Sequence, residues 1–387
     1  MTRVDRIDVV TARLPFRFSF GHALAERSES TNVYVRVVLD DGTVGYGEGV
    51  PREYVTGETV ESAVTALCER QAPALLGRSL SGPGDVEAAV NEAAPLDATP
   101  HANSAHCALE LALLDACGKH FGRPVSTWLA PRSAPFVTYD AVIPFVSPKK
   151  LAAIALVVRA LGIRQVKIKV GDDLDRDLRA LRLLRRLLGP RADLRVDANS
   201  AWKSADEALA AITAMRRLRI SAVEQPLPAG DIEGLAEITA RTTETIIVDE
   251  SLCTYDDALA LIEARACNAF NIRVSKCGGL LSSMRIARLA MENGLACGVG
   301  AQVGESGILS AAGRHLAAAI GSPRYLEGSG GSLLLEEDLT EERVVPGRRG
   351  RARPFAGPGL GVHVKEAVLE RHSLDRRIFR VEAEVAA

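Results

Sequence analysis

The stretch "QVKIKVGDDLDRDLRALRLLRRLLGPRADLRVDAN", residues 165–199, decides the fold class. It begins with a short β-rich run, which predicts a strand over residues 165–170. A helical stretch follows over residues 173–189, and a second strand-like run covers residues 194–199. A strand, a helix and another strand in this order predict a parallel βαβ unit.

The same unit recurs along the second part of the chain. Eight short runs, separated by helical stretches, are expected to form strands: residues 137–143, 165–170, 194–199, 221–226, 245–250, 269–274, 296–301 and 324–328. Eight such units in series favour a closed (β/α)₈ barrel over an open doubly wound sheet. We therefore expect an α/β protein with a TIM-type barrel over residues 131–335.

The N-terminal part follows a different pattern. Residues 3–48 alternate apolar and polar residues around a "DDG" turn, which predicts antiparallel strands. A helical period follows up to about residue 121, so residues 1–130 are expected to form an α+β domain. Residues 16–31 and 51–59 are expected to be loops, and the C-terminal segment, residues 336–387, is expected to return to this domain with further strands over residues 357–364 and beyond.

Composition excludes several classes of function. The 387 residues carry a formal net charge of −2 and a pI of about 6.4, which favours neither nucleic acid nor an anionic membrane as partner. The beginning lacks the apolar core of a secretory signal, and no apolar stretch approaches the roughly 20 residues that span a bilayer. Seven scattered cysteines without a C-x-x-C pair indicate reduced thiols. We expect a cytoplasmic protein.

Acidic residues end three successive predicted strands. Asp197 lies in "RVDAN", Glu224 in "VEQP" and Asp249 in "VDES". Catalytic groups of such barrels lie at the C-terminal ends of the strands, so these carboxylates are expected on one rim. Each one alone is more simply a helix cap, but three converging carboxylates repel one another unless a cation joins them. Their oxygen-only chemistry predicts Mg²⁺ and disfavours zinc.

Two lysines share one face of the strand over residues 165–170. Lys167 and Lys169 are two residues apart, which places both side chains on the same side of a strand. Neighbouring ammonium groups lower the pKa of at least one of them, which is how a lysine becomes a base near neutral pH. The alternative is a solvated pair, but only eight of the 47 basic residues are lysines, so the pair is unlike the arginine-rich rest of the chain.

These motifs resemble the enolase superfamily, and within it the muconate lactonizing enzyme subgroup of the mandelate racemase/muconate lactonizing enzyme family. The resemblance covers nearly the whole chain through "GYGEGVP", "KIKVG", "VDANSAW", "VEQPL", "VDESL", "NIRVSKCGGL", "GVGAQVGES" and "PGLGV". It implies an N-terminal capping domain on a modified (β/α)₇β-like barrel. It also implies a Mg²⁺ enzyme, with Mn²⁺ as an alternative ion, that removes the proton α to a substrate carboxylate through an enediolate.

Carried over by position, the resemblance makes Asp197, Glu224 and Asp249 the metal ligands and Lys169 the base, with Lys167 beside it. The subgroup usually has a second catalytic lysine where this chain has Arg273 in "NIR". Arginine is a poor base because its pKa exceeds about 12. Arg273 is therefore expected to bind a carboxylate or stabilise the enediolate.

Two classes of reaction stay open. With Lys169 as the single base, we expect cycloisomerisation or β-elimination, which makes the protein an isomerase or a lyase. The alternative is a racemase or epimerase of amino acids, N-acylamino acids or dipeptides that uses Lys169 and Lys276. An alternative of another class is a non-catalytic barrel that binds a carboxylate.

The substrate is expected to be a small carboxylate. The two N-terminal loops are expected to cover the barrel mouth. Glu305 is expected to hold Lys276 or a substrate hydroxyl, or to cap the next helix, and Glu327 is a weak substitute for the aspartate pair that dipeptide epimerases use. The resemblance also implies a homo-oligomer, a dimer or an octamer. The predicted substrate-binding residues are Asn199, Glu305, Glu327, Tyr54, Phe18, His22 and Arg27.

Overall fold

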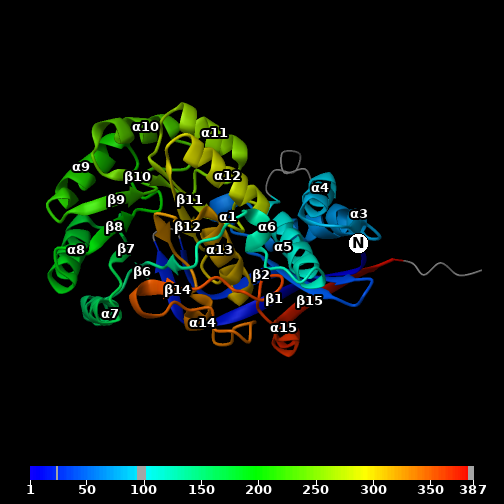
Figure 1. Cartoon of the computed structure of the whole chain (residues 1–387). Coiled ribbons are helices and arrows are strands. Elements are labelled where there is room, and N and C mark those ends of the chain that lie inside the picture. Colours follow the sequence, from blue (N-terminus) through cyan, green and yellow to red (C-terminus); the bar gives the residue numbers. More distant parts are fainter. Residues whose placement is uncertain (23–24, 94–101, 382–387) are drawn as a thin grey trace, which may run out of the picture.

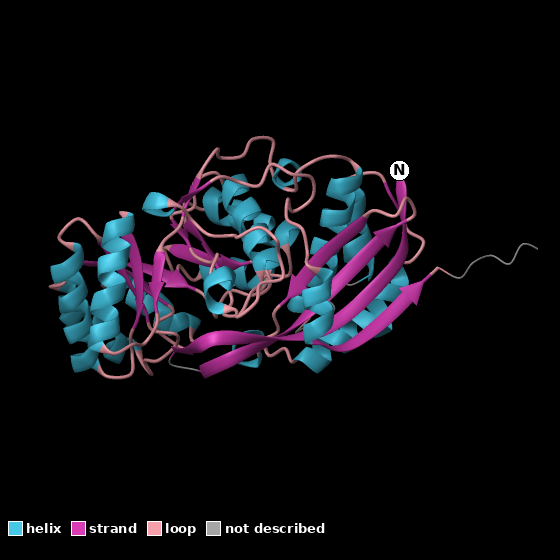
Figure 2. Ribbon diagram, turned by 90° about the horizontal axis from the view of Figure 1, so that it is seen from below, coloured by secondary structure: helices cyan, strands magenta, loops and turns pink. Residues whose placement is uncertain are grey.

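The computed structural model describes residues 1–22, 25–93 and 102–381, without the side chains of residues 20–26. A barrel-like domain and an α+β domain lie side by side (Figure 1). In the view of Figure 2, the long antiparallel strands of the α+β domain extend along the lower edge of the molecule toward the shorter strands of the barrel. No helix in these described ranges is long and apolar enough to cross a membrane.

The barrel sheet has eight strands in the order β13-β12-β11-β10-β9-β8-β7-β6, and every neighbouring pair is parallel. Its two ends meet where the N–H of Asp140 donates to the carbonyl of Leu326 at 2.8 Å. This curled parallel sheet confirms the predicted barrel class. The strands are β6 (Ala141–Ile143), β7 (Gln165–Lys169), β8 (Asp193–Asp197), β9 (Ile220–Glu224), β10 (Thr245–Val248), β11 (Ala269–Arg273), β12 (Ala296–Gly300) and β13 (Tyr325–Leu326).

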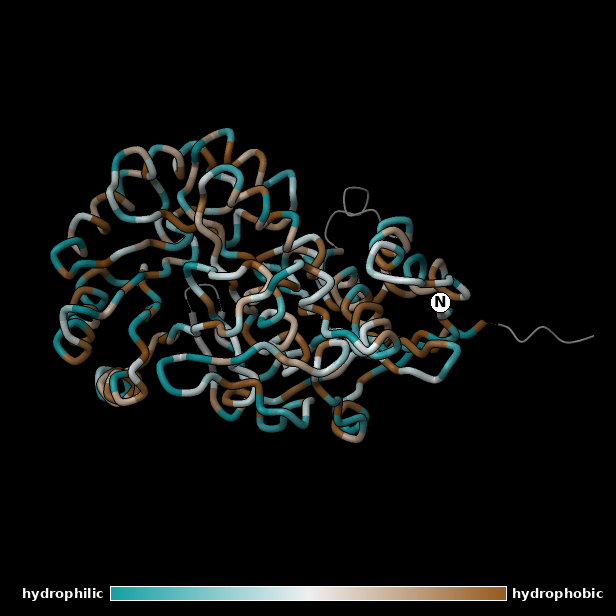
Figure 3. Tube along the Cα trace, viewed as in Figure 1, coloured by the Kyte–Doolittle hydropathy of each residue, from teal (hydrophilic) through white to brown (hydrophobic). Residues whose placement is uncertain are grey.

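A helix follows each of the first seven strands, and β13 leads only into the short α14 (Gly331–Leu334), which gives the (β/α)₇β form. The helices show why this sequence folds in this way. In α8, Asp173 caps the first turn by accepting the N–H of Arg176 at 2.9 Å, while Leu181 and Leu184 are buried. Hydrophilic and hydrophobic positions alternate along the outer helices (Figure 3). These helices are α7 (Pro148–Leu161), α8 (Leu174–Leu188), α9 (Ala205–Arg216), α10 (Ile232–Arg241), α11 (Tyr255–Glu263), α12 (Leu280–Glu292) and α13 (Gly307–Ile320).

The α+β domain is built on an antiparallel sheet in the order β15-β1-β2-β3, with β4 paired to β1. Strand β15 comes from the C-terminal segment and pairs with β1 over residues 6–12. The strands are β1 (Thr2–His22), β2 (Ala25–Leu39), β3 (Val44–Gly49), β4 (Ser79–Leu80) and β15 (Ser373–Arg380). The helices are α1 (Glu53–Thr56), α2 (Val60–Ala66), the π-helical turn Leu67–Gln71, α3 (Ala72–Leu75), α4 (Pro83–Ala93), α5 (Asn103–His120), α6 (Ser126–Leu129) and α15 (Glu366–His372).

Glycines let the buried helix α5 lie directly on β3. Gly45, Gly47 and Gly49 share one face of the strand, and a Cβ on any of them would collide with the backbone of α5. The opposite face of β3 carries Glu48, whose carboxylate reaches the barrel at Ser306, just before α13. The "GYGEG" motif therefore fixes the packing of the two domains as well as a strand.

Several predictions about local structure were wrong. Residues 16–31 are not a plain loop: β1 and β2 continue through them as a twisted ribbon with pairs such as Gly21 with Glu26, and residues 23–24 lie outside the described ranges. Residues 51–59 contain the helical turn α1. Within residues 137–143 only β6 joins the barrel, while β5 (Val137–Thr138) pairs with β14 (Arg351–Ala352).

The segment over residues 357–364 is also not a strand. Gly359 and Gly361 have positive φ angles of 67° and 68°, which form turns, and the carbonyl of Gly359 accepts the N–H of Val125. The pairing of β15 with β1 comes later in the chain. The domain boundaries near residues 130 and 335 stay predictions.

Candidate active site

Three buried carboxylates lie at the C-terminal ends of adjacent barrel strands. Asp197 ends β8, Glu224 ends β9 and Asp249 directly follows β10, and each is at most 1% exposed. Asp197 and Glu224 are direct partners across the parallel ladder. Because parallel strands end on the same rim, the sequence order alone brings these acids together.

Lys169 is held against this rim by the register of β7. It pairs with Asp197 in the ladder, and its Nζ donates to Asp197 Oδ2 and to Asn199 Oδ1, both at 2.6 Å. Its 8% exposed fraction excludes a solvated surface lysine. Lys169 therefore presents an amine at the mouth of the barrel beside a carboxylate.

Lys167 lies on the same face, one step deeper in the barrel. Its Nζ contacts Glu224 Oε1 at 2.8 Å, Glu327 Oε2 at 2.7 Å and Asp197 Oδ2 at 3.1 Å. Burial lowers the pKa of Lys167, but these carboxylates outweigh that effect and raise its pKa above the usual value. Lys167 therefore stays a cation, and its amine shares Asp197 Oδ2 with the amine of Lys169.

The two partnered carboxylates differ in their electrostatics. Burial raises the pKa of Asp197. The positive charges of Lys169 and Lys167 lower it by a larger amount, so the pKa lies well below the usual range. Burial raises the pKa of Glu224, and the negative charge of Asp197 raises it as well. Glu224 Oε1 accepts a hydrogen bond from Asn271 Nδ2 at 2.9 Å in addition to the contact with Lys167.

The donor chemistry of the rim fits a hard cation such as Mg²⁺. Asp197, Glu224 and Asp249 offer only carboxylate oxygens, and all three are buried. In the present arrangement each carboxylate points to a lysine or arginine. Accordingly, the described ranges contain no group of three or more His, Cys, Asp or Glu side chains gathered around one point.

Arg273 faces Lys169 from the other side of the barrel. Counted from β6, β7 and β11 are the second and sixth of eight strands, so their side chains approach the mouth from opposite sides. The Nη2 atom of Arg273 forms an ion pair with Asp249 Oδ2 and lies 3.9 Å from Glu250 Oε1. The guanidinium thus lies where a second group could act on a substrate held between β7 and β11.

Lys276 is buried behind this site rather than inside it. Its side chain is 0% exposed, and its Nζ donates to Asp249 Oδ1 at 2.9 Å, to the carbonyl of Asn271 at 3.1 Å and to the carbonyl of Asp249. These contacts use all three N–H donors of a charged lysine. Burial lowers the pKa of Lys276. In the turn after β11, Lys276 therefore holds Asp249 in position through hydrogen bonds to its carboxylate and its backbone carbonyl.

Glu327 and Glu305 both have partners within the barrel domain. Glu327 pairs with Lys167 and with Arg195, whose guanidinium also contacts Asp140 Oδ2 at 2.5 Å, so its carboxylate is already engaged in the barrel interior. Burial raises its pKa, but the charges of Lys167 and Arg195 lower it to about 2. Glu305 accepts the N–H of Gln302 at 2.6 Å.

Two of the three roles predicted for Glu305 were wrong. It does not hold Lys276, whose partners are Asp249 and Asn271. It does not cap the next helix either, because Ser306 is the N-cap of α13 and accepts the N–H of Ile308. Burial raises the pKa of Glu305 to about 8. The contact with a substrate hydroxyl stays a prediction.

Two site residues escaped the sequence analysis. Glu250 accepts a hydrogen bond from Asn199 Nδ2 at 3.0 Å, and its second oxygen has no partner in the described part of the chain. Asn271 orients Glu224. The signals were present: Glu250 follows Asp249 directly, and Asn271 is two residues before Arg273, so it shares the inward face of β11.

The predicted loop residues are spread over the N-terminal ribbon and the turn after β3. The guanidinium of Arg27 lies over the ring of Tyr54, 5.5 Å from its centroid. The turn itself is fixed to the barrel, since Val50 N donates to Ser275 Oγ at 2.8 Å. Phe18 is 55% exposed on the ribbon. The side chain of His22 lies outside the described residues.

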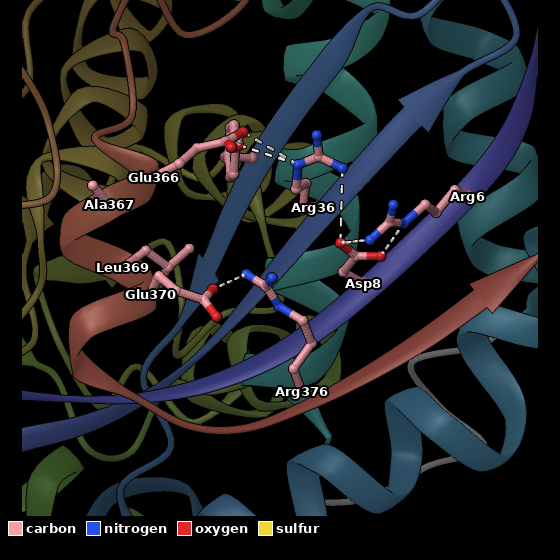
Figure 4. A pocket seen from close by; sticks show the side chains of 9 residues that line it. Arg6, Asp8, Arg36, Glu366, Ala367, Leu369, Glu370 and Arg376 are labelled. Carbon is pink, nitrogen blue, oxygen red and sulfur yellow. Dashed lines mark hydrogen bonds and ion pairs between the residues drawn. The ribbon is translucent and has the colours of Figure 1, made fainter.

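A cavity of about 310 Å³ lies on the other domain, between its sheet and α15 (Figure 4). Its walls carry three arginines, each paired with an acid: Arg6 with Asp8, Arg36 with Glu366, and Arg376 with Glu370. Each of these three arginines thus already has a carboxylate partner. The catalytic chemistry is therefore better placed at the strand ends of the barrel.

Two family models match most of the chain. Residues 150–368 match the family model described as "Enolase C-terminal domain-like", and residues 1–129 match that of the "Mandelate racemase / muconate lactonizing enzyme, N-terminal domain". The chain belongs to the mandelate racemase/muconate lactonizing enzyme family of the enolase superfamily. The resemblance drawn from the motifs is thereby confirmed.

Relatives that the sequence matches include racemases and epimerases. The N-succinyl-L-Arg/Lys racemase of Bacillus cereus is 29% identical over 98% of this chain and all of its own length, and its crystal structure superposes with a TM-score of 0.90. A hydrophobic dipeptide epimerase of Enterococcus faecalis is 30% identical over 82% of this chain and 87% of its own.

Two further structures show what family members bind. The dipeptide epimerase of E. faecalis was solved in complex with Mg and the dipeptide L-Leu-L-Tyr, with a TM-score of 0.84, 27% identity and coverage of 93% of this chain and 99% of that chain. The muconate lactonizing enzyme of Pseudomonas fluorescens was solved with muconolactone, with a TM-score of 0.88, 28% identity and coverage of 96% and 99%. Membership in this family makes an isomerase the supported class of enzyme.

Proposed function

We propose that the protein is a Mg²⁺-dependent isomerase that removes the proton α to the carboxylate of an N-acylamino acid or a dipeptide, with Lys169 as the base. The observation that carries this proposal is the position of the Lys169 amine, 2.6 Å from Asp197 and across the barrel from Arg273. The substrate class follows from the racemases and epimerases that the chain resembles over most of its length. We therefore place racemisation or epimerisation before cycloisomerisation or elimination as the reaction of this protein.

The carboxylates of Asp197, Glu224 and Asp249 would hold the Mg²⁺ ion. The chemistry that Mg²⁺ supplies when bound is Lewis-acid polarisation of a carboxylate. Each of the three acids now has a cationic partner on a flexible side chain, so each can exchange that partner without unfolding the rim. Mn²⁺ has the same preference for oxygen ligands and would substitute.

Lys169 acts as the base in its neutral form, and the cationic Lys167 beside it contacts the same oxygen of Asp197. Neutral Lys169 then takes the α proton, and the electron pair of the broken C–H bond moves into the substrate carboxylate to form an enediolate. Asn199 orients the amine through its 2.6 Å contact. Arg273 stabilises the developing negative charge from the opposite side.

The stereochemical course depends on what returns the proton. Inversion needs an acid on the face of Arg273, and Lys276 meets this need only by leaving its three acceptors. A one-base course, by cycloisomerisation or β-elimination, is the second candidate function. It is favoured by the arginine at position 273 and by the buried position of Lys276.

Proton NMR in D₂O tests the proposal directly. The purified protein, with and without Mg²⁺, is incubated with N-acylamino acids, dipeptides, muconates and hydroxy acids. Mg²⁺-dependent loss of the α-hydrogen signal in N-acylamino acids or dipeptides, with appearance of the other isomer, supports the proposal. Exchange with retention, or ring closure or elimination in another class, supports the second candidate. Binding without exchange in any compound would leave the non-catalytic carboxylate-binding barrel.

A further inference from the structure

A buried arginine lies at the junction of the two domains, above the strand ends. Arg52 follows β3 and is 2% exposed, which is rare for a charged side chain without a counterion. Its Nη2 donates to Ser30 Oγ at 2.5 Å and to the carbonyl of Val303 at 2.8 Å, while Nη1 donates to the carbonyl of Pro51 at 2.7 Å. All of these acceptors are neutral oxygens.

Within the described ranges, Arg52 forms no ion pair with a carboxylate, and its Nε has no hydrogen-bond partner. An arginine has five N–H donors, so part of its capacity is unused. Taking a charge out of water without an opposite charge costs several kcal/mol. The fold therefore maintains a buried positive charge whose natural partner is missing from the part of the chain that the structure describes.

A second arginine adds to this charge. Arg27 comes from β2, its guanidinium lies over Tyr54, and its buried Nε likewise has no partner among the described residues. Burial lowers the pKa of Arg52 to about 10, and the positive charge of Arg27 contributes to this shift. Two like charges from different segments thus lie close enough to influence each other.

Among the side chains that the structure describes, two acids that influence the pKa of Arg52, Glu48 and Glu305, do not neutralise the pair. Glu48 is occupied by the N–H groups of Ser306 and Leu309 at the beginning of α13. Glu305 has a pKa raised to about 8 by burial, so it is largely protonated at neutral pH. Neither acid lies within ion-pair distance of Arg52, and both act on it only at longer range.

The segment that carries Arg52 contacts two loops of the barrel. Gln302 Nε2, in the loop after β12, donates to the carbonyl of Val50 at 3.0 Å. Farther along, the carbonyl of Val55 is 3.9 Å from the thiol of Cys253, in the loop after β10. Arg52 is thus set between the loops that follow β10 and β12, on the side of the barrel that carries Arg273.

We propose that Arg52 and Arg27 form an anion subsite that binds a carboxylate at the far end of the substrate. This inference rests on the proposed function, in which the reacting carboxylate lies at the strand ends, and it narrows the substrate to molecules with a second negative charge. That charge comes from the end of an N-acyl chain or from an acidic side chain of a dipeptide. A charge-assisted pair of this kind discriminates strongly against a neutral analogue, because the analogue leaves the buried arginine unpaired.

The test uses matched substrate pairs that differ only in the distal charge. One pair is N-succinyl- and N-butanoyl-amino acid, and the other is a dipeptide ending in glutamate and the same dipeptide ending in glutamine. We expect kcat/KM for exchange of the α-hydrogen to be about 30-fold higher for the charged member of one pair. The pair that shows the preference identifies the source of the charge.

Variants of Arg52 and Arg27 then show whether these residues cause the preference for the charged substrate. Arg52→Gln is expected to lower the charged-to-neutral ratio to about three or less, because only the charged member loses a charge-assisted partner, and Arg52→Lys is expected to keep part of the ratio. Arg27→Gln is a second, independent variant in case Arg52→Gln fails to fold. Arg78, whose side chain is 41% exposed and pairs with Glu92, supplies the control Arg78→Gln, which is expected to leave the ratio unchanged.

Two results would overturn the anion subsite. One is equal turnover of both members of each pair by the wild-type protein. The other is an equal loss on both members in Arg52→Gln, which would assign Arg52 a structural role only. If no compound undergoes exchange, the proposed function fails, and calorimetry then judges the subsite separately: equal Kd values for N-succinyl- and N-butanoyl-amino acids would exclude it.

Discussion

Two sets of buried carboxylates in this molecule have opposite kinds of partner. At the strand ends, Asp197, Glu224 and Asp249 contact lysine and arginine side chains. At the junction of the domains, Glu48 and Glu110 accept backbone N–H groups at the beginnings of α13 and α12. A lysine or arginine side chain can rotate away from its carboxylate partner, whereas a backbone N–H in a helix is fixed in place. The first set can therefore change partner during a reaction, whereas the second holds the two domains in place.

The largest expected effect concerns the strand ends. Lys169→Ala removes the proposed base, and we expect the rate of α-hydrogen exchange in D₂O to fall by about 10³- to 10⁴-fold. Lys169→Arg keeps the charge and is expected to lose the rate almost as completely, because arginine stays protonated. The exposed Lys149 provides the control Lys149→Ala. Exchange that survives in Lys169→Ala within tenfold of wild type would refute the assignment of the base.

The next effect concerns the domain junction and its dependence on pH. Burial raises the pKa of Glu110 to about 8, whereas an unfolded glutamate has a pKa of about 4.3. Between these values the folded protein binds a proton that the unfolded chain lacks. The free energy of unfolding should therefore decrease as pH rises from about 5 to 8, by on the order of 3 to 5 kcal/mol from this group.

Urea denaturation at several pH values, with the wild type and Glu110→Gln, measures this dependence. The variant cannot titrate, so its slope between pH 5 and 8 should be flatter than that of the wild type, whatever its stability at one pH. The exposed Glu69 gives the control Glu69→Gln. An identical slope in wild type and Glu110→Gln would mean that Glu110 is already ionised in the folded protein.

A smaller loss is expected from Glu48→Ala. The change leaves the N–H groups of Ser306 and Leu309 without their acceptor, and each buried unpaired group costs about 1 to 3 kcal/mol. Partial compensation by water should leave a loss of about 2 to 3 kcal/mol in the free energy of unfolding at neutral pH. Circular dichroism during urea denaturation measures it, and the exposed Glu53→Ala is the control. A loss below 0.5 kcal/mol, a threshold of about the size expected at surface sites, would show that Glu48 does not fasten the junction.

Much of this arrangement was predictable from the sequence, because it depends on local pattern. The alternation of strands and helices set the barrel, and the recurrence of acids at strand ends placed Asp197 and Glu224 on one rim. The register of β7 then brought Lys169 opposite Asp197 without any long-range information. Patterns that repeat within one βαβ unit therefore predict both the fold and the positions of the strand-end residues.

What the sequence did not predict depends on contacts between distant segments. The burial of Lys276 requires the carbonyls of Asn271 and Asp249 to meet in space, and the role of Glu327 depends on Arg195, which is 132 residues away in the chain. The ribbon over residues 16–31 has no clean period, so the sequence predicts a loop where the structure has paired strands. The oligomeric state, the compartment and the closure of the N-terminal segments over the barrel stay predictions.

Calorimetric titration of metal-free protein with Mg²⁺ tests the central claim most directly, because it asks whether the strand-end acids exchange their cationic partners for a metal ion. We expect one Mg²⁺ per chain in the wild type, binding at least about 100-fold weaker in Asp249→Asn, and unchanged binding in Asp206→Asn, whose carboxylate is exposed on α9. Equal affinity in wild type and Asp249→Asn, or no binding in the wild type, would contradict it.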